Sequence, residues 1–190
     1  MVNPRHRALT IPSVILFLSG CGSPEKPAGN LPNPVPSANT SADTNALTPV
    51  CRLKLPGSWS EQSESDPSRW VFKRSDGKEQ ITISAMSFTS EPDLKKRTVL
   101  LDRCIELRRK AETDGAPSPI TLDAVGKAIN DDVCAAKFLG QESAVHRRFA
   151  CLMMATPTSI LTFYFEALDT PDSEFLSNAQ STLNSINLAK

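Results

Sequence analysis

The sequence is poor in the residues from which most catalytic and metal sites are built. Its 190 residues include only two histidines, His6 and His146, and it has neither a Cys-x-x-Cys pair nor a glycine-rich phosphate loop. No cysteine–histidine spacing suits a zinc site. A Ser–His–Asp or Cys–His mechanism would depend on a single histidine, because the other lies in the N-terminal segment. We therefore predict that the protein is not an enzyme, with no catalytic residue, no cofactor and no bound metal.

An excess of charge of one sign and a long apolar run are also missing. The chain has 21 basic and 21 acidic residues, so nothing indicates nucleic acid as a partner. The apolar stretch from Ala8 to Leu18 is interrupted by Pro12. It is shorter than the roughly 20 apolar residues that a membrane-spanning helix needs. A permanent transmembrane helix is therefore not expected.

The N-terminus has the pattern of a secretory signal, with Arg5 and Arg7 before the apolar stretch and small residues after it. The residues Leu18-Ser19-Gly20-Cys21 resemble the lipobox of bacterial lipoproteins. The resemblance implies a signal peptide over residues 1–20, cleavage before Cys21, attachment of a diacylglycerol to the Cys21 thiol and acylation of the new amino terminus. An ordinary signal peptide followed by a chance cysteine is the alternative.

The same resemblance implies a location in the cell envelope. Several acyl chains on Cys21 would anchor the protein stably to a membrane. In bacteria with two membranes, an aspartate after the lipidated cysteine often retains a lipoprotein in the inner membrane, and this sequence has Gly22 instead. We expect a lipid-anchored protein at the periplasmic face of the outer membrane, with the inner membrane as the alternative.

Residues 21–50 have the composition of a linker. They are rich in Ser, Asn, Thr and Ala, and six prolines are spread among them: Pro24, Pro27, Pro32, Pro34, Pro36 and Pro49. Such a segment cannot bury enough apolar surface to offset its ordering entropy. We predict a disordered tether over residues 21–50 and one globular domain over residues 51–190.

Alternation and turn signals predict an antiparallel sheet in that domain. Cys51–Leu55 alternates, and Asp76-Gly77 between two alternating runs is typical of a two-residue hairpin turn. The opposed pairs would be Phe72 with Ile81, Trp70 with Ile83, and Arg74 with Glu79. Further strands are predicted over residues 120–129, 133–139, 146–155 and 160–167.

Two helices complete the prediction. The first has Ser90 as its N-cap and Asp93 at the capping-box position, and it ends before Gly115. Its apolar stripe is predicted to be buried: Leu94, Leu100, Leu101, Cys104, Ile105, Leu107 and Ala111. The second helix opens at Thr170-Pro171. The order of the elements predicts an α+β fold, an antiparallel β-sheet packed by two main helices.

The segment Leu53-Lys-Leu-Pro-Gly-Ser-Trp59 resembles the opening of PsbP-like domains. This family includes photosystem extrinsic subunits, a Ran-binding nucleotide-release factor and DcrB-type envelope lipoproteins. The resemblance implies a PsbP-like α/β/α sandwich. Members mostly bind or assist other proteins and share no catalytic residues, so no site residue is transferred. The expected function is that of a non-enzymatic envelope lipoprotein that binds or assists another envelope protein. A small-ligand carrier or sensor and, third, a hydrolytic enzyme are the alternatives.

With Cys21 assigned to lipid, four cysteines remain: Cys51, Cys104, Cys134 and Cys151. An even number in an oxidising compartment suggests disulfides. If a hairpin loop centres on Glu142-Ser143, Cys134 faces Cys151 at a distance that a disulfide accepts. Cys51 would then pair with Cys104. Four buried free thiols are the alternative.

Three polar features are interpreted as solvent-exposed surface rather than as sites. His146, beside Arg147, is expected at the surface, and Asp131-Asp132 is expected to be solvated rather than to bind a metal. The basic residues of the first helix are expected to form a solvated face: Lys95, Lys96, Arg97, Arg103, Arg108, Arg109 and Lys110. Contact of this face with anionic lipid headgroups or an acidic protein is the alternative.

Overall fold

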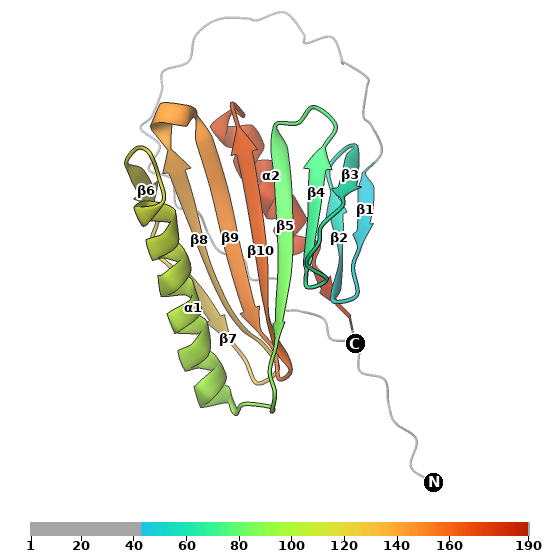
Figure 1. Ribbon diagram of the computed structural model, residues 1–190, viewed down its shortest axis with the longest axis vertical. Helices are drawn as coiled ribbons and strands as arrows, with labels where there is room; N and C mark the ends of the chain where they lie inside the picture. Colours follow the sequence, from blue (N-terminus) through green and yellow to red (C-terminus); the bar gives the residue numbers. More distant parts are fainter. Residues whose placement is uncertain (1–42, 190) are drawn as a thin grey trace, which may run out of the picture. The chain divides into compact units, whose positions relative to one another are not determined.

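The structure is a computed structural model that describes residues 43–189. The predicted signal peptide, Cys21 and most of the predicted tether lie outside the described residues. Two antiparallel sheets and two long helices make up the domain (Figure 1). The strands are β1 (Thr44–Leu47), β2 (Cys51–Leu55), β3 (Trp59–Gln62), β4 (Arg69–Arg74), β5 (Glu79–Ser87), β6 (Ile120–Leu122), β7 (Gly126–Ile129), β8 (Cys134–Glu142), β9 (Arg147–Ala155), β10 (Ser159–Leu168) and β11 (Asn187–Leu188). The helices are α1 (Leu94–Asp114), the short 3-10 helix η1 (Ser143–Val145) and α2 (Asp172–Asn184).

The large sheet has eight strands in the order β3-β4-β5-β10-β9-β8-β6, with β7 also paired to β8. The small sheet has the order β1-β2-β11. Strand β10 lies between β5 and β9, as its apolar character on both faces predicts. The predicted α+β class, an antiparallel sheet packed by two helices, is confirmed.

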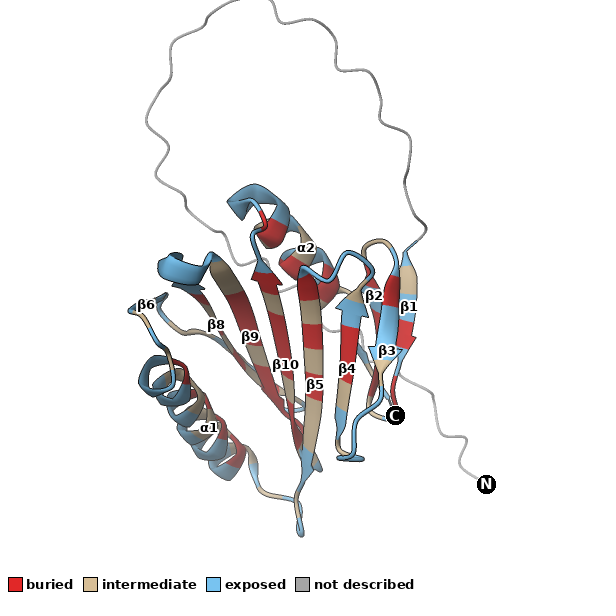
Figure 2. Cartoon of the chain, turned by 45° about the horizontal axis from the view of Figure 1, so that its top comes forward, coloured by how far each residue is buried: buried red, intermediate tan, exposed pale blue. Residues whose placement is uncertain are grey.

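Two hydrophobic cores lie on opposite faces of the large sheet. On one face, Phe163 and Phe165 of β10 pack in a core that includes Phe175 of α2 and the small sheet. On the other face, Tyr164 of β10 packs in a core that includes Leu101 of α1. Successive residues of a strand point to opposite faces, so β10 contributes to both cores. Figure 2 shows the resulting bands of buried residues along the central strands.

The predicted hairpin is confirmed. Phe72 lies opposite Ile81 and Trp70 lies opposite Ile83, and Nη1 of Arg74 is 2.9 Å from Oε2 of Glu79. Gly77 has φ of +74°, the left-handed conformation that glycine adopts without a steric penalty. The local signal therefore determined both the turn and the register.

The predicted register of the next hairpin is wrong. Strand β8 continues through Gly140 to Glu142, which lies opposite Arg147, so Cys134 faces Ala155 and not Cys151. The reason lies at Gly140, which resembles a turn residue in the sequence. In the strand, a Cβ at this position would come within 2.1 Å of the ring of Phe149. The glycine thus makes room for an aromatic ring in the core.

Three further boundaries differ from the prediction. Strand β1 lies inside the range assigned to the tether, because Ala46 and Thr48 are buried, 3% and 5% exposed. The N-cap of α1 is Asp93, whose carboxylate accepts a hydrogen bond from the backbone N–H of Lys96 at 2.8 Å, and not Ser90. The single strand predicted over residues 120–129 is divided into β6 and β7.

Candidate functional site

The α1-facing side of the large sheet is covered over only part of its width. Helix α1 packs mainly on β8, β9 and β6, and the core beneath it also buries Ile160 and Tyr164 of β10, 4% and 7% exposed; none of the described helices covers β5 and β4 on this side (Figure 1). Ile81 and Ile83 point into the opposite core, so their neighbours on β5 point to the uncovered face. These residues are Gln80, Thr82, Ser84 and Met86. We call this area the uncovered half of the sheet.

Helix α1 borders the uncovered half with apolar side chains that the sequence analysis placed in the core. Leu101 and Ile105 are buried as predicted, but Leu100 and Leu107 are 37% and 59% exposed. The seven predicted apolar residues therefore form two separate rows on the helix. The sequence contained a signal for this, because seven apolar positions span more of the circumference than one buried face needs.

A cluster of charges fixes the C-terminal half of α1 to the sheet. Arg147 donates to Glu112 of α1 at 3.0 Å, to Glu166 at 2.8 Å and to the hydroxyl of Tyr164 at 2.6 Å. Arg108 of α1 is 2.6 Å from Glu112 and its guanidinium lies 4.1 Å from the centre of the Tyr164 ring. Each charged group has an opposite partner, so the cluster is suited to hold α1 in place rather than to react.

The pKa values in this cluster are shifted accordingly. Burial, assisted by the charge of Glu112, raises the pKa of the Tyr164 hydroxyl above its ordinary value. Burial alone would lower the pKa of Arg147, but its hydrogen bond to Glu166 and the other acceptors outweigh this and raise it. Both groups therefore keep their protons over the whole neutral range.

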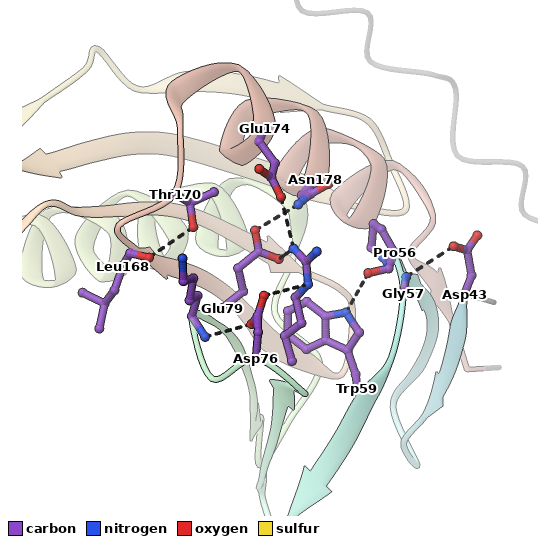
Figure 3. Close-up of polar contacts among 12 residues, drawn as sticks. Asp43, Pro56, Gly57, Trp59, Asp76, Glu79, Leu168, Thr170, Glu174 and Asn178 are labelled. Atoms are coloured by element: carbon purple, nitrogen blue, oxygen red, sulfur yellow. Dashed lines mark hydrogen bonds and ion pairs between the residues drawn. The ribbon is translucent and has the colours of Figure 1, made fainter. Parts of the chain in front are cut away.

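A second cluster joins the first hairpin to α2 (Figure 3). The side chain of Glu79 has no exposed surface. It accepts hydrogen bonds from Arg74 at 2.9 Å and from Asn178 of α2 at 2.9 Å. Glu174 of α2 also lies 3.4 Å from Arg74. The carboxylate is fully paired and serves to attach α2 to the sheet.

The segment that resembles PsbP-like domains, residues 53–59, forms the turn from β2 to β3 beside this cluster. Nε1 of Trp59 donates to the carbonyl oxygen of Pro56 at 3.0 Å (Figure 3). The Trp59 ring lies 6.0 Å from the ring of Phe165, centre to centre. The motif therefore closes the α2-side core with Leu53, Leu55 and Trp59.

The four cysteines of the domain are free. Cys134 and Cys151 are not opposed, and Cys51 lies in the core on the α2 side of the large sheet, whereas Cys104 packs on the α1 side. Both predicted disulfides are thus contradicted by the structure. Burial raises the pKa of Cys151 to about 12, and it also raises the pKa values of Cys51 and Cys104. None of these three is activated as a thiolate nucleophile.

His146 lies at the surface, as predicted, with its side chain 72% exposed. Its Nδ1 is 3.0 Å from Oδ1 of Asp169, which is also exposed. Both residues have φ of 50°. Asp131 and Asp132 are exposed as predicted. Within residues 43–189 no group of three or more His, Cys, Asp or Glu residues is arranged to hold a metal ion.

The predicted basic face of α1 is smaller than its sequence indicates. Arg97 is only 6% exposed and donates to the carbonyl oxygens of Asp131 and Asp132. Arg108 belongs to the buried cluster, and Arg109 donates to the carbonyl oxygen of Asp123 at 2.6 Å. The sequence could not show that these three arginines bend back onto the sheet. Lys95, Lys96, Arg103 and Lys110 remain exposed.

An open hollow of about 450 Å³ lies at the loop between β3 and β4. Its lining is mostly polar and includes Glu61, Glu64, Asp66 and Arg69. Its shape and lining differ from the enclosed apolar cavity that a carrier of small apolar ligands needs. In the described part of the chain, no helix is both long and apolar enough to cross a membrane.

Comparison with known proteins identifies the fold. No protein-family model and no curated protein sequence matches the chain. The solution structure of cyanobacterial PsbP (CyanoP) from Synechocystis has a TM-score of 0.59 at 12% identity, over 85% of this chain and 100% of that one. The Ran-binding protein Mog1p of Saccharomyces cerevisiae has a TM-score of 0.50 at 9% identity, over 78% of this chain and 96% of that one.

Two weaker likenesses have TM-scores below 0.5. LpqN of Mycobacterium tuberculosis, a protein involved in cell envelope biogenesis, has a TM-score of 0.49 at 16% identity, over 83% of this chain and 90% of that one. A protein of Bacteroides thetaiotaomicron has a TM-score of 0.42 at 12% identity, over 74% of this chain, which spans only 45% of that protein. At these identities the likenesses concern the fold alone: the chain has the α+β fold of PsbP and Mog1p.

Proposed function

We propose that the protein is a non-enzymatic lipoprotein, anchored through Cys21 at the periplasmic face of the outer membrane, whose domain binds another envelope protein. The anchor rests on the lipobox-like segment ending at Cys21. The binding role rests on one observation, which is that the uncovered half of the large sheet is bordered by exposed apolar side chains of α1.

The composition of this area supports binding to a protein. Leu100, Leu107 and Met86 are 37%, 59% and 53% exposed, whereas single exposed apolar residues need no explanation. An apolar patch with a polar rim is typical of interaction sites. Thr82 and Ser84 precede Met86 on the same face of β5, are half-buried, and offer hydroxyl groups that a partner could hydrogen-bond. The surface is thus suited to a partner that presents both apolar and polar groups.

The alternatives receive less support from the same structure. The hollow beside β3 is open and mostly polar, which does not favour an apolar carrier. His146 contacts Asp169 on exposed loops rather than in a cleft, which does not favour a hydrolytic enzyme. We therefore keep partner binding as the proposed activity.

The anchor is tested by mass spectrometry of the mature protein from membranes. We expect a chain that begins at Cys21 and carries a diacylglycerol and an additional acyl group. Cys21→Ala should abolish both the modification and recovery in the membrane fraction, whereas Cys104→Ala should change neither. A chain cleaved elsewhere and without lipid would contradict the proposal.

The partner is tested by chemical crosslinking in intact cells followed by mass spectrometry. We expect one envelope protein to be crosslinked reproducibly to the anchored wild-type chain. The same adduct should be lost when Cys21→Ala releases the domain from the membrane. The absence of any protein adduct from the anchored wild-type chain would contradict a binding role.

A further inference from the structure

One row of residues on α1 has the spacing of a helix-packing seam. Leu100, Cys104, Leu107 and Ala111 follow one another at intervals of four, three and four residues, as apolar residues do where two helices pack along their length. The row spans about 16 Å, or three turns. Leu107 is 59% exposed, Ala111 is exposed and Cys104 is half-buried. We call these four residues the α1 seam.

The α1 seam lies on the flank of the helix that faces the uncovered half of the sheet. Arg108, which follows Leu107, reaches to 4.1 Å from the ring centre of Tyr164 on β10. On the other flank, Asp102 is 2.6 Å from Nζ of Lys127 on β7. Strands β10 and β7 lie on opposite sides of β9 and β8 in the sheet. One flank of α1 therefore faces β10 and the other faces β7. The seam therefore lies on the flank of α1 that faces β10, beyond which β5 follows in the sheet.

A row of basic residues accompanies the seam on its outer side. Lys96, Arg103 and Lys110 follow at intervals of seven residues, so they lie one above another on the helix. The side chains of Lys96 and Lys110 are 73% and 71% exposed. Their contacts with Asp93 and Asp114 are surface ion pairs, which contribute little and exchange readily. Arg103 forms no ion pair with any residue between 43 and 189.

We propose that the α1 seam and the uncovered strand β5 form a docking site for an amphipathic helix of the envelope partner, with acidic residues beside its apolar stripe. This proposal rests on the proposed function and specifies its partner. Each basic residue of the row would face a carboxylate at the flanking positions of the partner helix, the arrangement that selects partners in helix pairs.

The dimensions and the position of the seam favour a helix over a lipid surface. A helix is about 10 Å wide and strands are about 4.8 Å apart, so the two uncovered strands β5 and β4 together match the width of one helix. A membrane would meet the outermost face of α1, with the exposed Val99 and Arg103, but it would not reach the α1 seam, which lies on the flank of the helix above the sheet. A single helix could therefore contact the α1 seam with its apolar stripe and the row of basic residues with its acidic flank.

Two synthetic helical peptides test the charge selection. Both carry a leucine stripe, one flanked by glutamate and the other by lysine, and each is titrated into the full chain in nanodiscs of zwitterionic lipid, followed by fluorescence anisotropy. We expect the acidic peptide to bind about ten-fold more tightly than the basic one, since three ion pairs contribute together. The double variant Arg103→Glu/Lys110→Glu should reverse this preference.

Matched controls locate the site. Arg52→Glu/Lys54→Glu makes the same charge change at exposed positions of β2 and should leave the preference unchanged. Leu107→Asp should weaken binding of the acidic peptide about ten-fold. Leu47→Asp, at a position of similar exposure on β1 (64% against 59%), should not. Circular dichroism verifies that each variant is folded.

The outcomes separate this proposal from the proposed function. Equal affinities for the two peptides, or an equal effect of the control variants, would overturn the docking site, as would loss of binding to anionic vesicles as the only effect of Arg103→Glu/Lys110→Glu. If crosslinking in cells still captures a protein, the binding role stands and the site is elsewhere. If the peptides discriminate but no cellular adduct forms, the site stands and the binding role falls.

Discussion

The carboxylate of Glu79 is a charge whose side chain has no contact with solvent, and its two oxygens are both occupied. One accepts from Arg74 and the other from Asn178. An ionised group that is removed from water has to be compensated by such bonds. Because Arg74 and Asn178 belong to β4 and α2, this single residue controls how the helix is attached to the sheet.

Removing this carboxylate should be costly. Glu79→Ala leaves the half-buried Asn178 without its acceptor and leaves Arg74 only its longer contacts with Asp76 and Glu174, both at 3.4 Å, so we expect the free energy of unfolding in urea to decrease by about 3 kcal/mol. Glu174→Ala is the matched control, because the Glu174 side chain is 47% exposed and lies 3.4 Å from the same Arg74. It should cost less than about 1 kcal/mol. Equal losses would show that the burial of Glu79 contributes nothing.

The four cysteines of the domain allow a test of the structure at the same scale. In the native state at pH 8 we expect a thiol reagent to modify Cys104 first, because it is half-buried while Cys51, Cys134 and Cys151 are buried. Reaction should be slow, since burial raises the pKa of Cys104 as well. After denaturation without reductant, all four thiols should react. Two or fewer reactive thiols would contradict the structure and indicate that at least one disulfide is present.

Helix α1 begins at a cap that the sequence analysis placed three residues too early. Ser90 and Asp93 both suit an N-cap, and only the structure shows that the Asp93 carboxylate accepts from Lys96. Asp93→Ala should therefore lower the Tm by about 3 °C. Ser90→Ala should leave the Tm unchanged in the same calorimetric scan. The opposite result would move the start of the helix back to Ser90.

Sequence patterns predicted those elements whose determinants are local. The turn at Asp76-Gly77 fixed its own register, and β10 was recognised as central from its two apolar faces. The register of β8 and β9 depends instead on the fit of Phe149 over Gly140, a contact between residues on different strands. Strand β1 was missed because its polar sequence becomes ordered only by pairing with β2.

The candidate site was beyond the reach of the sequence for a related reason. Leu100 and Leu107 are as apolar as Leu101, and which of them is buried depends on where α1 crosses the sheet. That position is set by Arg147 and Glu112, which are distant in the chain and meet only in the fold. The basic face was overestimated because Arg97, Arg108 and Arg109 are held by internal acceptors.

The molecule as a whole should lose stability in alkali. Cys151 is buried and its pKa is raised to about 12, so the folded chain keeps a proton that the unfolded chain releases from about pH 9 upward. The unfolded state then binds fewer protons, and the free energy of unfolding falls by about 1.4 kcal/mol per pH unit from this thiol. The raised pKa of Tyr164 acts in the same direction above its ordinary value of 10.0.

Urea unfolding at intervals between pH 8 and pH 10.5 measures this dependence. In Cys151→Ala the free energy of unfolding should fall less steeply with pH, by the contribution of one thiol. The variant should already be less stable than the wild type at pH 8, because packing is lost. Leu47→Ala, which changes an exposed side chain of β1, should leave the slope unchanged. An identical slope in wild type and Cys151→Ala would contradict a pKa of Cys151 that burial raises in the folded state.

The position of β1 determines how a pull on the tether would enter the domain. The hydroxyl of Thr44 accepts from the backbone N–H of Trp59 at 3.0 Å and donates to the carbonyl oxygen of Gly57 at 2.7 Å. Thr44 is the first residue of β1, an edge strand that pairs only with β2 in the small sheet. If Cys21 anchors the chain as we propose, a force from the N-terminal side would act first on β1 and, through the hydrogen bond between Thr44 and Trp59, on the start of β3 in the large sheet. The small sheet and the start of β3 would therefore bear this load before it reached the surface that we propose binds the partner.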